Sequence, residues 1–503
     1  MSIRRHNPMS SKPRLRRGAR CLLVSGLAIA GLLQAEEMGT RGPPSLHGRI
    51  GVPHADAGAG PVSLLFANPS GVAETIHNSG AVDTSNEFFQ VLGTNGRTCE
   101  TCHQARAGWS VTPASVQARF DATDGTDPIF RTNDGSNSPH ADVATVEERR
   151  RAFSLLLTKG LIRIGLPIPS EAEFELTGAS DPYGFASTAE LSLFRRPLPA
   201  TNLSQFDTVM WDGRETFEDA GSTDCIVGTA NCFASHAFNL ADQANGATVG
   251  HAQAAQPLTP AQRNSIVAFE LGLATAQRYD ANAHNLAADG ARGGALALAA
   301  QPFYFGINDF AYGDYRRATT FDAVAFTLFG AWNTGTPAQD ISAIAIARSS
   351  IARGEALFNS RPFTVEGVAG FNDRIGVSVI QGTCSVCHNA PNSGSTSLPT
   401  TMDIGISAAA RRTPDVPLYT LRNRITGEML STTDPGRGLV TGRWDDVGKF
   451  KVPSLRALAA RAPYFHDGSA DDLAAVVAFY DQRFRMHLSA DEASDLVAFL
   501  RAL

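Results

Sequence analysis

Apolar residues recur at helical spacing in several parts of this chain. The segments that share the 3.6-residue period are 86–92, 260–277, 351–358, 473–480 and 496–503. The sequences Ser469-x-x-Asp472 and Ser489-x-x-Glu492 are typical of a helix N-terminus, and the second fits a capping box. We therefore expect helices rather than strands to form most of the regular structure.

Residues 1–35 differ from the rest of the chain. Residues 1–20 contain arginine and lysine but no acid, and an apolar run over 21–33 follows. A basic region, a short apolar region and a small residue at the cut are typical of a secretory signal peptide, here ending at Ala35. A single-span anchor is the alternative, but the apolar run is short for a membrane span. We therefore expect no membrane-spanning segment after cleavage of the signal peptide. Small residues predict a flexible lead over 36–61.

The composition then limits the class of protein. A chain of 503 residues is long enough for roughly two to four domains, and 43% apolar residues allow a substantial core. The net charge of −6 argues against a general nucleic-acid binder. Loss of the basic signal peptide would make the exported chain more acidic still. We therefore expect a periplasmic protein that attracts cationic partners.

Two pentapeptides carry the same Cys-x-x-Cys-His pattern. Their residues are Cys99, Cys102 and His103 in the first, and Cys384, Cys387 and His388 in the second. This is the attachment signature of c-type haem, because two thiols add to the two vinyl groups of one porphyrin and the adjacent imidazole reaches the iron. A zinc site is the alternative, but it would need a second pair of ligands nearby, and none is evident. The sequence therefore predicts two covalently bound haem c groups.

The two motifs divide the chain into two similar parts. Each motif follows a segment with helical spacing, and a few helices around a large apolar haem are enough for a small domain. We expect a mainly α fold, with two cytochrome c-like haem lobes packed together, long loops and little sheet. The predicted boundaries are an N-terminal haem domain over 62–277, an aromatic-rich linker over 278–345 and a C-terminal haem domain over 346–503. Buried packing is the favoured interpretation of the aromatic residues in the linker.

A further pair of cysteines lies between the motifs. Cys225 and Cys232 belong to a stretch rich in Gly, Ser, Thr and Asn. In an exported protein such a pair predicts a disulfide that closes a surface loop, and a catalytic thiol is the less favoured alternative.

Four more segments resemble motifs of one family. They are Met-Trp-Asp-Gly-Arg at 210–214, Gly-Glu-Ala-Leu-Phe at 354–358, Phe-Lys-Val-Pro-Ser-Leu-Arg at 450–456 and Ala-Pro-Tyr-Phe-His-Asp-Gly at 462–468. Their order around the two haem motifs resembles that of the bacterial dihaem cytochrome c peroxidases and the related MauG-type enzymes. The resemblance covers about residues 85–275 and 345–503. It is specific to the superfamily, not to one activity within it.

The resemblance implies a division of labour between the two haems. The N-terminal haem, with His103 as its proximal ligand, would meet hydrogen peroxide. The C-terminal haem, with His388 as its proximal ligand, would handle electron transfer. Trp211 would lie between them as a relay, close to Arg214 of the same motif. The electrons would come from a small donor protein, either a cytochrome c or a cupredoxin.

The peroxide side of the N-terminal haem departs from the family pattern. Relatives place a Gln and a Glu there, ten residues apart, and Gln243 matches the first. The second position is Gln253, and an amide cannot accept the first proton of peroxide as a carboxylate can. His251 lies two residues away and is the candidate for the base instead. An ordinary surface or packed histidine is the alternative.

Two further ligand assignments depend on the resemblance. The sixth ligand of the C-terminal haem is Met in the peroxidases and Tyr in the MauG-type enzymes. The family position falls on Tyr480, with Met486 as the alternative. Relatives also hold Ca²⁺ between the lobes, on backbone carbonyls that correspond to Arg461 and Pro463. The expected side-chain ligand is not obvious, because Arg196 lies near its place.

Together these features predict an enzyme. We expect an exported dihaem oxidoreductase that reduces hydrogen peroxide with electrons from a small redox protein. A MauG-type oxidase, which would use peroxide to modify a partner protein, is one alternative, and Tyr480 favours it. A non-catalytic dihaem electron carrier is another, and Gln253 leaves room for it.

Overall fold

The fold combines α-helices with several small β-sheets. A computed structural model describes residues 63–333 and 342–503, so the predicted signal peptide and flexible lead lie outside the described residues. The described part contains eleven α-helices and thirteen strands in five small sheets, with 31% helix and 18% strand. The expectation of a mainly α fold with little sheet is therefore wrong. The predicted domain boundaries stay a prediction.

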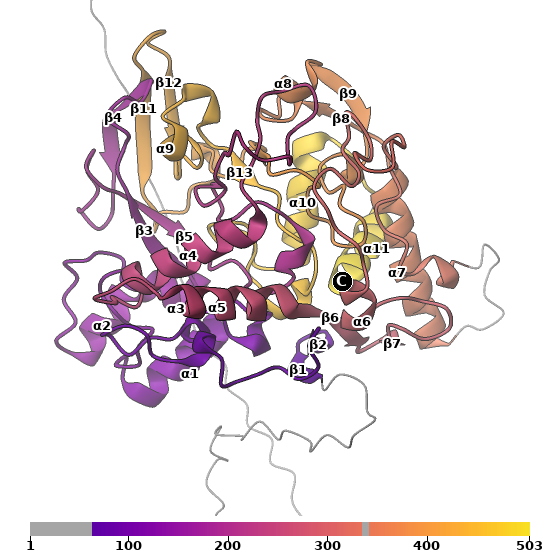
Figure 1. Cartoon of the computed structure of the whole chain (residues 1–503), viewed down its shortest axis with the longest axis horizontal. Coiled ribbons are helices and arrows are strands. Elements are labelled where there is room, and N and C mark those ends of the chain that lie inside the picture. Colours follow the sequence, from indigo (N-terminus) through magenta and orange to yellow (C-terminus); the bar gives the residue numbers. More distant parts are fainter. Residues whose placement is uncertain (1–62, 334–341) are drawn as a thin grey trace, which may run out of the picture. The chain divides into compact units, whose positions relative to one another are not determined.

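The elements follow one another as Figure 1 shows. The α-helices are α1 (Pro113–Thr123), α2 (Val146–Ala152), α3 (Ser154–Lys159), α4 (His236–Gly250), α5 (Pro260–Gly272), α6 (Ala295–Ala299), α7 (Ala343–Ser360), α8 (Asn372–Ile375), α9 (Gly438–Thr441), α10 (Leu473–Phe484) and α11 (Ala490–Arg501). The strands are β1 (Leu64–Asn68), β2 (Gly71–His77), β3 (Ile162–Leu166), β4 (Phe174–Ser180), β5 (Leu191–Arg195), β6 (Leu273–Asp280), β7 (His284–Asn285), β8 (Phe363–Glu366), β9 (Val379–Gly382), β10 (Thr401–Met402), β11 (Leu418–Asn423), β12 (Met429–Thr432) and β13 (Phe450–Lys451). Among the described residues, no helix combines the length and the apolar character that crossing a membrane requires.

Strand β6 shows why the sequence pattern did not predict the sheets. The helix predicted over 260–277 ends at Gly272, and the chain continues directly as β6. Strand β6 pairs antiparallel with β2, with His77 opposite Leu273 and Gly71 opposite Asp280. Because its partner lies about 200 residues earlier in the chain, local periodicity could not reveal this strand.

A second sheet joins distant parts of the sequence. Strand β4 pairs antiparallel with β11, with Phe174 opposite Asn423 and Ser180 opposite Leu418, and β12 completes the sheet. Figure 1 shows β4, from the first part of the chain, beside β11, from the last part. Segments of the two predicted haem domains therefore share backbone hydrogen bonds.

Helix α7 and the two C-terminal helices enclose one apolar core. The capping box at Ser489 is present and starts α11, whereas α10 begins with Asp472 as its N-cap rather than with Ser469. Helix α7 is longer than the predicted segment 351–358 but contains all of it. The predicted turns at 86–92 are reduced to a short 3₁₀ turn, Glu87–Phe89.

Three aromatic residues of the predicted linker, Phe326, Phe329 and Trp332, pack into this same core. The ring of Phe326 lies 5.1 Å from that of Phe358 on α7 and 5.2 Å from that of Phe499 on α11, measured between centroids. The buried carboxylate of Glu355 accepts hydrogen bonds from the backbone N–H groups of Leu328 and Phe329. Buried packing is therefore what the structure shows for these three aromatic side chains, whereas Tyr312 of the same predicted linker is exposed.

Gly354 lies where α7 crosses α11 at close range. A Cβ at this position would meet the backbone oxygen of Asp495 at 2.0 Å and the Cβ of Phe499 at 2.7 Å. The Gly-Glu pair of the Gly-Glu-Ala-Leu-Phe motif thus has two structural roles: the glycine permits the crossing, and Glu355 holds the aromatic segment.

We expect Gly354→Ala to lower the free energy of unfolding by about 1–3 kcal/mol, because the added methyl group must push two helices apart. Gly246→Ala is the matched control, since that helical glycine has open space where a Cβ would stand. The control should be neutral or gain up to about 1 kcal/mol from helix propensity. Denaturant unfolding of both variants measures the difference, and equal stability would contradict the crossing geometry.

Candidate functional site

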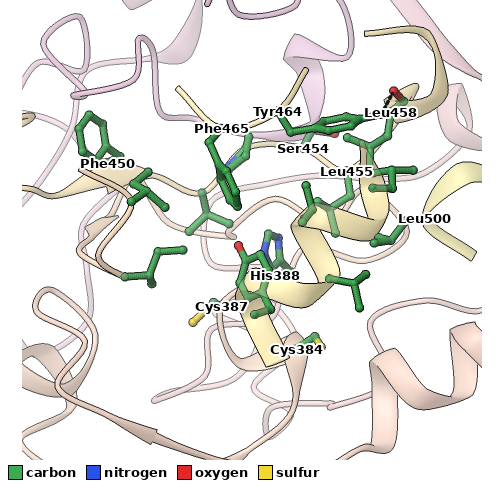
Figure 2. A pocket seen from close by; sticks show the side chains of 18 of the residues that line it. Cys384, Cys387, His388, Phe450, Ser454, Leu455, Leu458, Tyr464, Phe465 and Leu500 are labelled. Carbon is green, nitrogen blue, oxygen red and sulfur yellow. Dashed lines mark hydrogen bonds between the residues drawn. The ribbon is translucent and has the colours of Figure 1, made fainter. Parts of the chain in front are cut away.

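The two Cys-x-x-Cys-His motifs line two cavities that share one wall. The first motif lines what we call the N-terminal cavity, and the second lines the C-terminal cavity. Figure 2 shows Cys384, Cys387 and His388 facing the C-terminal cavity, with apolar side chains such as Phe465 and Leu500 around them. Each cavity is thus mostly apolar and carries two thiols and one imidazole.

Both imidazoles are fixed in one orientation by a backbone carbonyl. The Nδ1–H of His103 donates to the oxygen of Trp109 at 3.2 Å, and that of His388 donates to the oxygen of Gly394 at 2.5 Å. A carbonyl can only accept, so the proton belongs on Nδ1 and the lone pair on Nε2. Burial lowers the pKa of both rings to about 4, so each is neutral at physiological pH.

The donor set fits haem attachment. The four motif cysteines are free thiols, and burial raises their pKa values to about 11 or 12, so they are protonated. Among the described residues there is no group of three or more His, Cys, Asp or Glu side chains placed to hold a metal ion. Two thiols beside one imidazole with a free Nε2, on the wall of an apolar cavity, are what covalent haem c requires.

One wall separates the two cavities. The residues that line both of them are Arg196, Pro197, Pro199, Trp211 and Lys451. The indole Nε1–H of Trp211 donates to the backbone oxygen of Arg196 at 2.8 Å, and the Trp211 oxygen accepts from the Lys451 N–H at 2.8 Å. The structure therefore places Trp211 in the position that a relay between the two sites would occupy.

Arg214 lines the N-terminal cavity and is anchored on a buried carboxylate. Its Nη1 donates to both carboxylate oxygens of Asp212, at 3.2 and 3.1 Å. Burial alone would raise the pKa of Asp212, but the charges of Arg195 and Arg214 outweigh it and hold that pKa at about 2. Arg214 thus contributes a fixed positive charge to the cavity wall.

Helix α4 supplies another wall of the N-terminal cavity. Its lining residues, together with the one that follows the helix, recur at helical spacing: Leu240, Gln243, Ala244, Ala247, Thr248 and His251. The structure therefore brings Gln243 and His251 to the site. Gln253 is not among the lining residues of the described chain. It is exposed with a φ of +55°, because the backbone turns outwards after α4.

The disulfide loop lies outside this wall. Cys225 and Cys232 are joined by a disulfide, and the neighbouring Ile226 and Phe233 pack against Phe305 and Leu398. Of the described residues between Arg214 and Leu240, none lines the N-terminal cavity. The loop therefore adds packing with later segments of the chain without altering the cavity face of α4.

Two acidic residues of this region were missed by sequence reasoning. The Asp134 carboxylate lies 2.5 Å from the Nδ1 of His251, although 117 residues separate them, so no local signal could have found it. Glu270 lines the cavity one helical turn after Ile266 on α5, and its Oε2 is buried without a partner. Burial raises the pKa of Glu270 to about 8. An acid on the apolar face of the predicted helix was the signal available for Glu270.

Both candidates for the sixth ligand line the C-terminal cavity. Tyr480 belongs to the cavity face of α10, and burial raises the pKa of its phenol. Helix α10 ends at Phe484, and Arg485 then adopts a left-handed conformation with a φ of +50°. The chain therefore turns back and returns Met486 to the same cavity. The choice between the two stays a prediction.

The residues at the predicted calcium position do not fit that ion. The guanidinium of Arg196 donates to the backbone oxygens of Val111 at 2.6 Å, Lys159 at 2.7 Å and Arg461 at 3.0 Å. The Arg461 oxygen, one of the expected calcium ligands, is therefore already engaged by a cation. Burial lowers the pKa of Arg196 to about 9, which leaves it charged at neutral pH and repulsive to Ca²⁺.

We expect removal of divalent cations with EGTA to leave the unfolding temperature and the visible absorption spectrum unchanged. Arg196→Ala should instead destabilise the protein by about 1–3 kcal/mol, because three carbonyls lose their donor. Thermal unfolding with and without EGTA measures both effects. A wild-type loss of stability that added Ca²⁺ restores would contradict this assignment.

Comparisons with known proteins identify relatives for part of the chain. No protein-family model matches it. It is 32% identical over 157 residues to the cytochrome-c peroxidase IdrP1 of Pseudomonas sp. (strain SCT), a match that covers 27% of this chain and 38% of the relative. It is also 32% identical over 130 residues to the cytochrome c551 peroxidase of Nitrosomonas europaea, which covers 25% of this chain and 33% of the relative.

Matches among solved structures include that of a MauG-like protein associated with microbial copper homeostasis, with 14% sequence identity, a TM-score of 0.31, and coverage of 83% of this chain and 87% of the other. The matched segments span about a third of the curated relatives' own lengths. The names of these relatives support a haem-peroxidase type of enzyme. The predicted resemblance is thus confirmed: over about a quarter of its length, this chain is similar to bacterial cytochrome c peroxidases.

Proposed function

We propose that the protein is an exported dihaem c-type oxidoreductase that reduces hydrogen peroxide. Peroxide is consumed at the N-terminal cavity, and electrons from a small redox protein, a cytochrome c or a cupredoxin, pass through the C-terminal site. The observation that carries the proposal is that two cavities, each with a Cys-x-x-Cys-His wall, share a wall that contains Trp211. The similarity to cytochrome c peroxidases supports the same class of reaction.

The chain's own residues would hold and orient the cofactors. Cys99 and Cys102 would form the thioether links in the N-terminal cavity, and the Nε2 of His103 would face the metal. The second motif offers the same three groups to the C-terminal cavity. When bound, haem c supplies the iron redox chemistry that peroxide reduction needs. Each peroxide takes up two electrons and two protons and leaves as two waters.

The shared wall suits electron transfer between the two sites. The ring of Trp211 is held on one side by its hydrogen bond to the Arg196 oxygen. On another side it meets the ring of His466 edge to face, with 6.3 Å between centroids. A rigid aromatic ring between two redox centres shortens the distance that an electron must cross through saturated groups. Trp211 therefore acts as the relay in this proposal.

We expect His103→Gly to abolish peroxide-dependent oxidation of a reduced small cytochrome c, with a loss of at least about 100-fold, since peroxide chemistry depends on the N-terminal haem. The C-terminal haem should still be reduced. Stopped-flow absorption measures both, and intact mass verifies that both haems remain attached. Peroxide turnover that survives the substitution would reverse the assignment of the two sites.

The wild-type protein in the same experiment separates the candidate functions. Rapid oxidation of the reduced cytochrome supports peroxide reduction. A long-lived oxidised spectrum with little cytochrome turnover favours a MauG-type oxidase. A spectrum that peroxide leaves unchanged favours a non-catalytic electron carrier and contradicts the proposal.

The second candidate function, a MauG-type oxidase acting on a partner protein, is favoured by the position of Tyr480. Its phenol lies on the cavity face of α10, and the same cavity is lined by Cys384 and Cys387, which would attach the C-terminal haem. A phenolate oxygen is a hard ligand that favours the ferric state over the ferrous state. Such a ligand would suit the storage of oxidising equivalents better than the transfer of single electrons.

We expect Tyr480→Phe to change the absorption spectrum of the C-terminal haem, because the substitution removes the ligand oxygen and keeps the ring. Met486→Leu is the matched control, since both side chains line the same cavity and the control removes only the thioether. The control spectrum should equal that of the wild type. The opposite pattern would make Met486 the ligand and would remove the support for the second candidate.

A further inference from the structure

A carboxylate joins a histidine to an arginine beside the N-terminal cavity. The Nδ1 of His251 lies 2.5 Å from the Oδ2 of Asp134, and the Nη1 of Arg97 lies 2.5 Å from the Oδ1 of the same carboxylate. The side chains of Asp134 and Arg97 are only 6% and 3% exposed, whereas that of His251 is 40% exposed. His251 and Arg97 both line the cavity.

The surroundings hold this row of three side chains in place. Arg97 also donates from Nε to the oxygen of Pro128 at 2.8 Å and from Nη2 to that of Ile129 at 2.8 Å. The backbone oxygen of His251 accepts from Asn95 Nδ2 at 2.8 Å and from Arg97 Nη1 at 3.1 Å. Both the ring of His251 and its backbone are therefore fixed by groups outside α4.

The charge on Asp134 decides which nitrogen of His251 carries the proton. Burial alone would raise the pKa of Asp134, but the hydrogen bonds and charges of His251 and Arg97 outweigh it and lower that pKa. Asp134 is thus an ionised carboxylate, which accepts hydrogen bonds and donates none. It takes the Nδ1–H of His251 and leaves a lone pair on Nε2, the nitrogen opposite the carboxylate.

We propose that His251 is the proton acceptor for peroxide in the N-terminal cavity and that Asp134 is the positioning residue that fixes the tautomer of its ring, with the lone pair on Nε2. This inference rests on the proposed function. The O–H bond of hydrogen peroxide breaks, its proton goes to Nε2, and the hydroperoxide anion remains. The proton returns to the leaving oxygen as the first water forms, and two electrons from the reduced donor protein with two protons from solvent convert the remaining oxygen to the second water. His251 thus supplies the base. Gln253 does not, because its side chain is exposed and is an amide.

Replacement of Asp134 by Asn tests this arrangement sharply. Arginine can only donate, so the amide oxygen of Asp134→Asn must face Arg97, and the amide NH₂ must face His251. The Nδ1 of His251 then has to accept, and its proton moves to Nε2. The substitution therefore keeps the shape and the hydrogen bonds of the site but turns a proton acceptor into a donor.

The experiment uses the holoprotein and two probes, hydrogen peroxide and cyanide. Cyanide enters as HCN and must also lose a proton on binding to ferric haem, so its binding rate reports the base without any turnover. We expect Asp134→Asn and His251→Gln each to slow both bimolecular rates by about 10²–10⁴-fold. Asp127→Asn is the matched control, because it alters another Asp–Arg pair of the same region away from the cavity. Its rates should stay at the wild-type value.

The two probes separate failure of this inference from failure of the proposed function. Variants with wild-type rates for both probes would overturn the role of Asp134 and His251. A wild-type protein that ignores peroxide but binds cyanide in an Asp134-dependent way would keep His251 and Asp134 as the proton-accepting pair of the cavity and would refute peroxide reduction. A six-coordinate N-terminal haem that loses a ligand in His251→Gln would make His251 an iron ligand and overturn the inference. Imidazole added to His251→Ala should restore part of the cyanide rate.

Discussion

A buried guanidinium holds the shared wall together. Arg195, at the end of β5, lies 2.5 Å from Asp212 through Nη1 and 2.7 Å from Asp434 through Nε. Its side chain and both carboxylates are at most 3% exposed. Because Asp212 follows Trp211 and Asp434 belongs to the C-terminal half, one ion network joins the two halves beside Trp211. Loss of one partner would leave a buried unpaired charge, at a cost of about 3–5 kcal/mol.

The two cavities on either side of the shared wall are built from the same kinds of structural element. Each has a short turn that carries the Cys-x-x-Cys-His residues, a backbone carbonyl that orients the histidine, and a helix with one face towards the cavity. The helix is α4 in the N-terminal cavity and α10 in the C-terminal cavity. The difference lies in what these helices present: Gln243 and the Asp134-paired His251 in the N-terminal cavity, and Tyr480 among apolar neighbours in the C-terminal cavity. That difference suits proton transfer at the first site and electron transfer at the second.

The sequence predicted best the features that depend on neighbouring residues. Attachment of haem follows from five consecutive residues, and the helical faces of 473–480 and 496–503 follow from their periodicity. The capping box at Ser489 is local in the same sense. Strands β4 and β11 are different, because each is stabilised by a partner about 240 residues away and carries no clear alternation of its own. The prediction of little sheet failed for this reason.

The N-terminal site shows the same limit at the level of single residues. The resemblance to the family placed Gln243 and Gln253 as a pair, but only Gln243 lines the N-terminal cavity, and Gln253 is exposed after α4. Asp134 comes from a loop far from His251 in sequence, so no pattern could have linked the two. Arg196 likewise reveals its role only through the three carbonyls that it joins. Long-range hydrogen bonds thus complete a site whose framework is locally encoded.

The proposed function depends on two haem groups bound through the two Cys-x-x-Cys-His motifs. Intact-protein mass spectrometry under denaturing conditions, with the Cys102→Ala/Cys99→Ala and Cys387→Ala/Cys384→Ala double variants beside the wild type, tests this most directly. We expect the mass of two covalent haems on the wild-type chain and of one haem on each double variant. A wild-type mass with one haem or none, or a variant that keeps both, would contradict it.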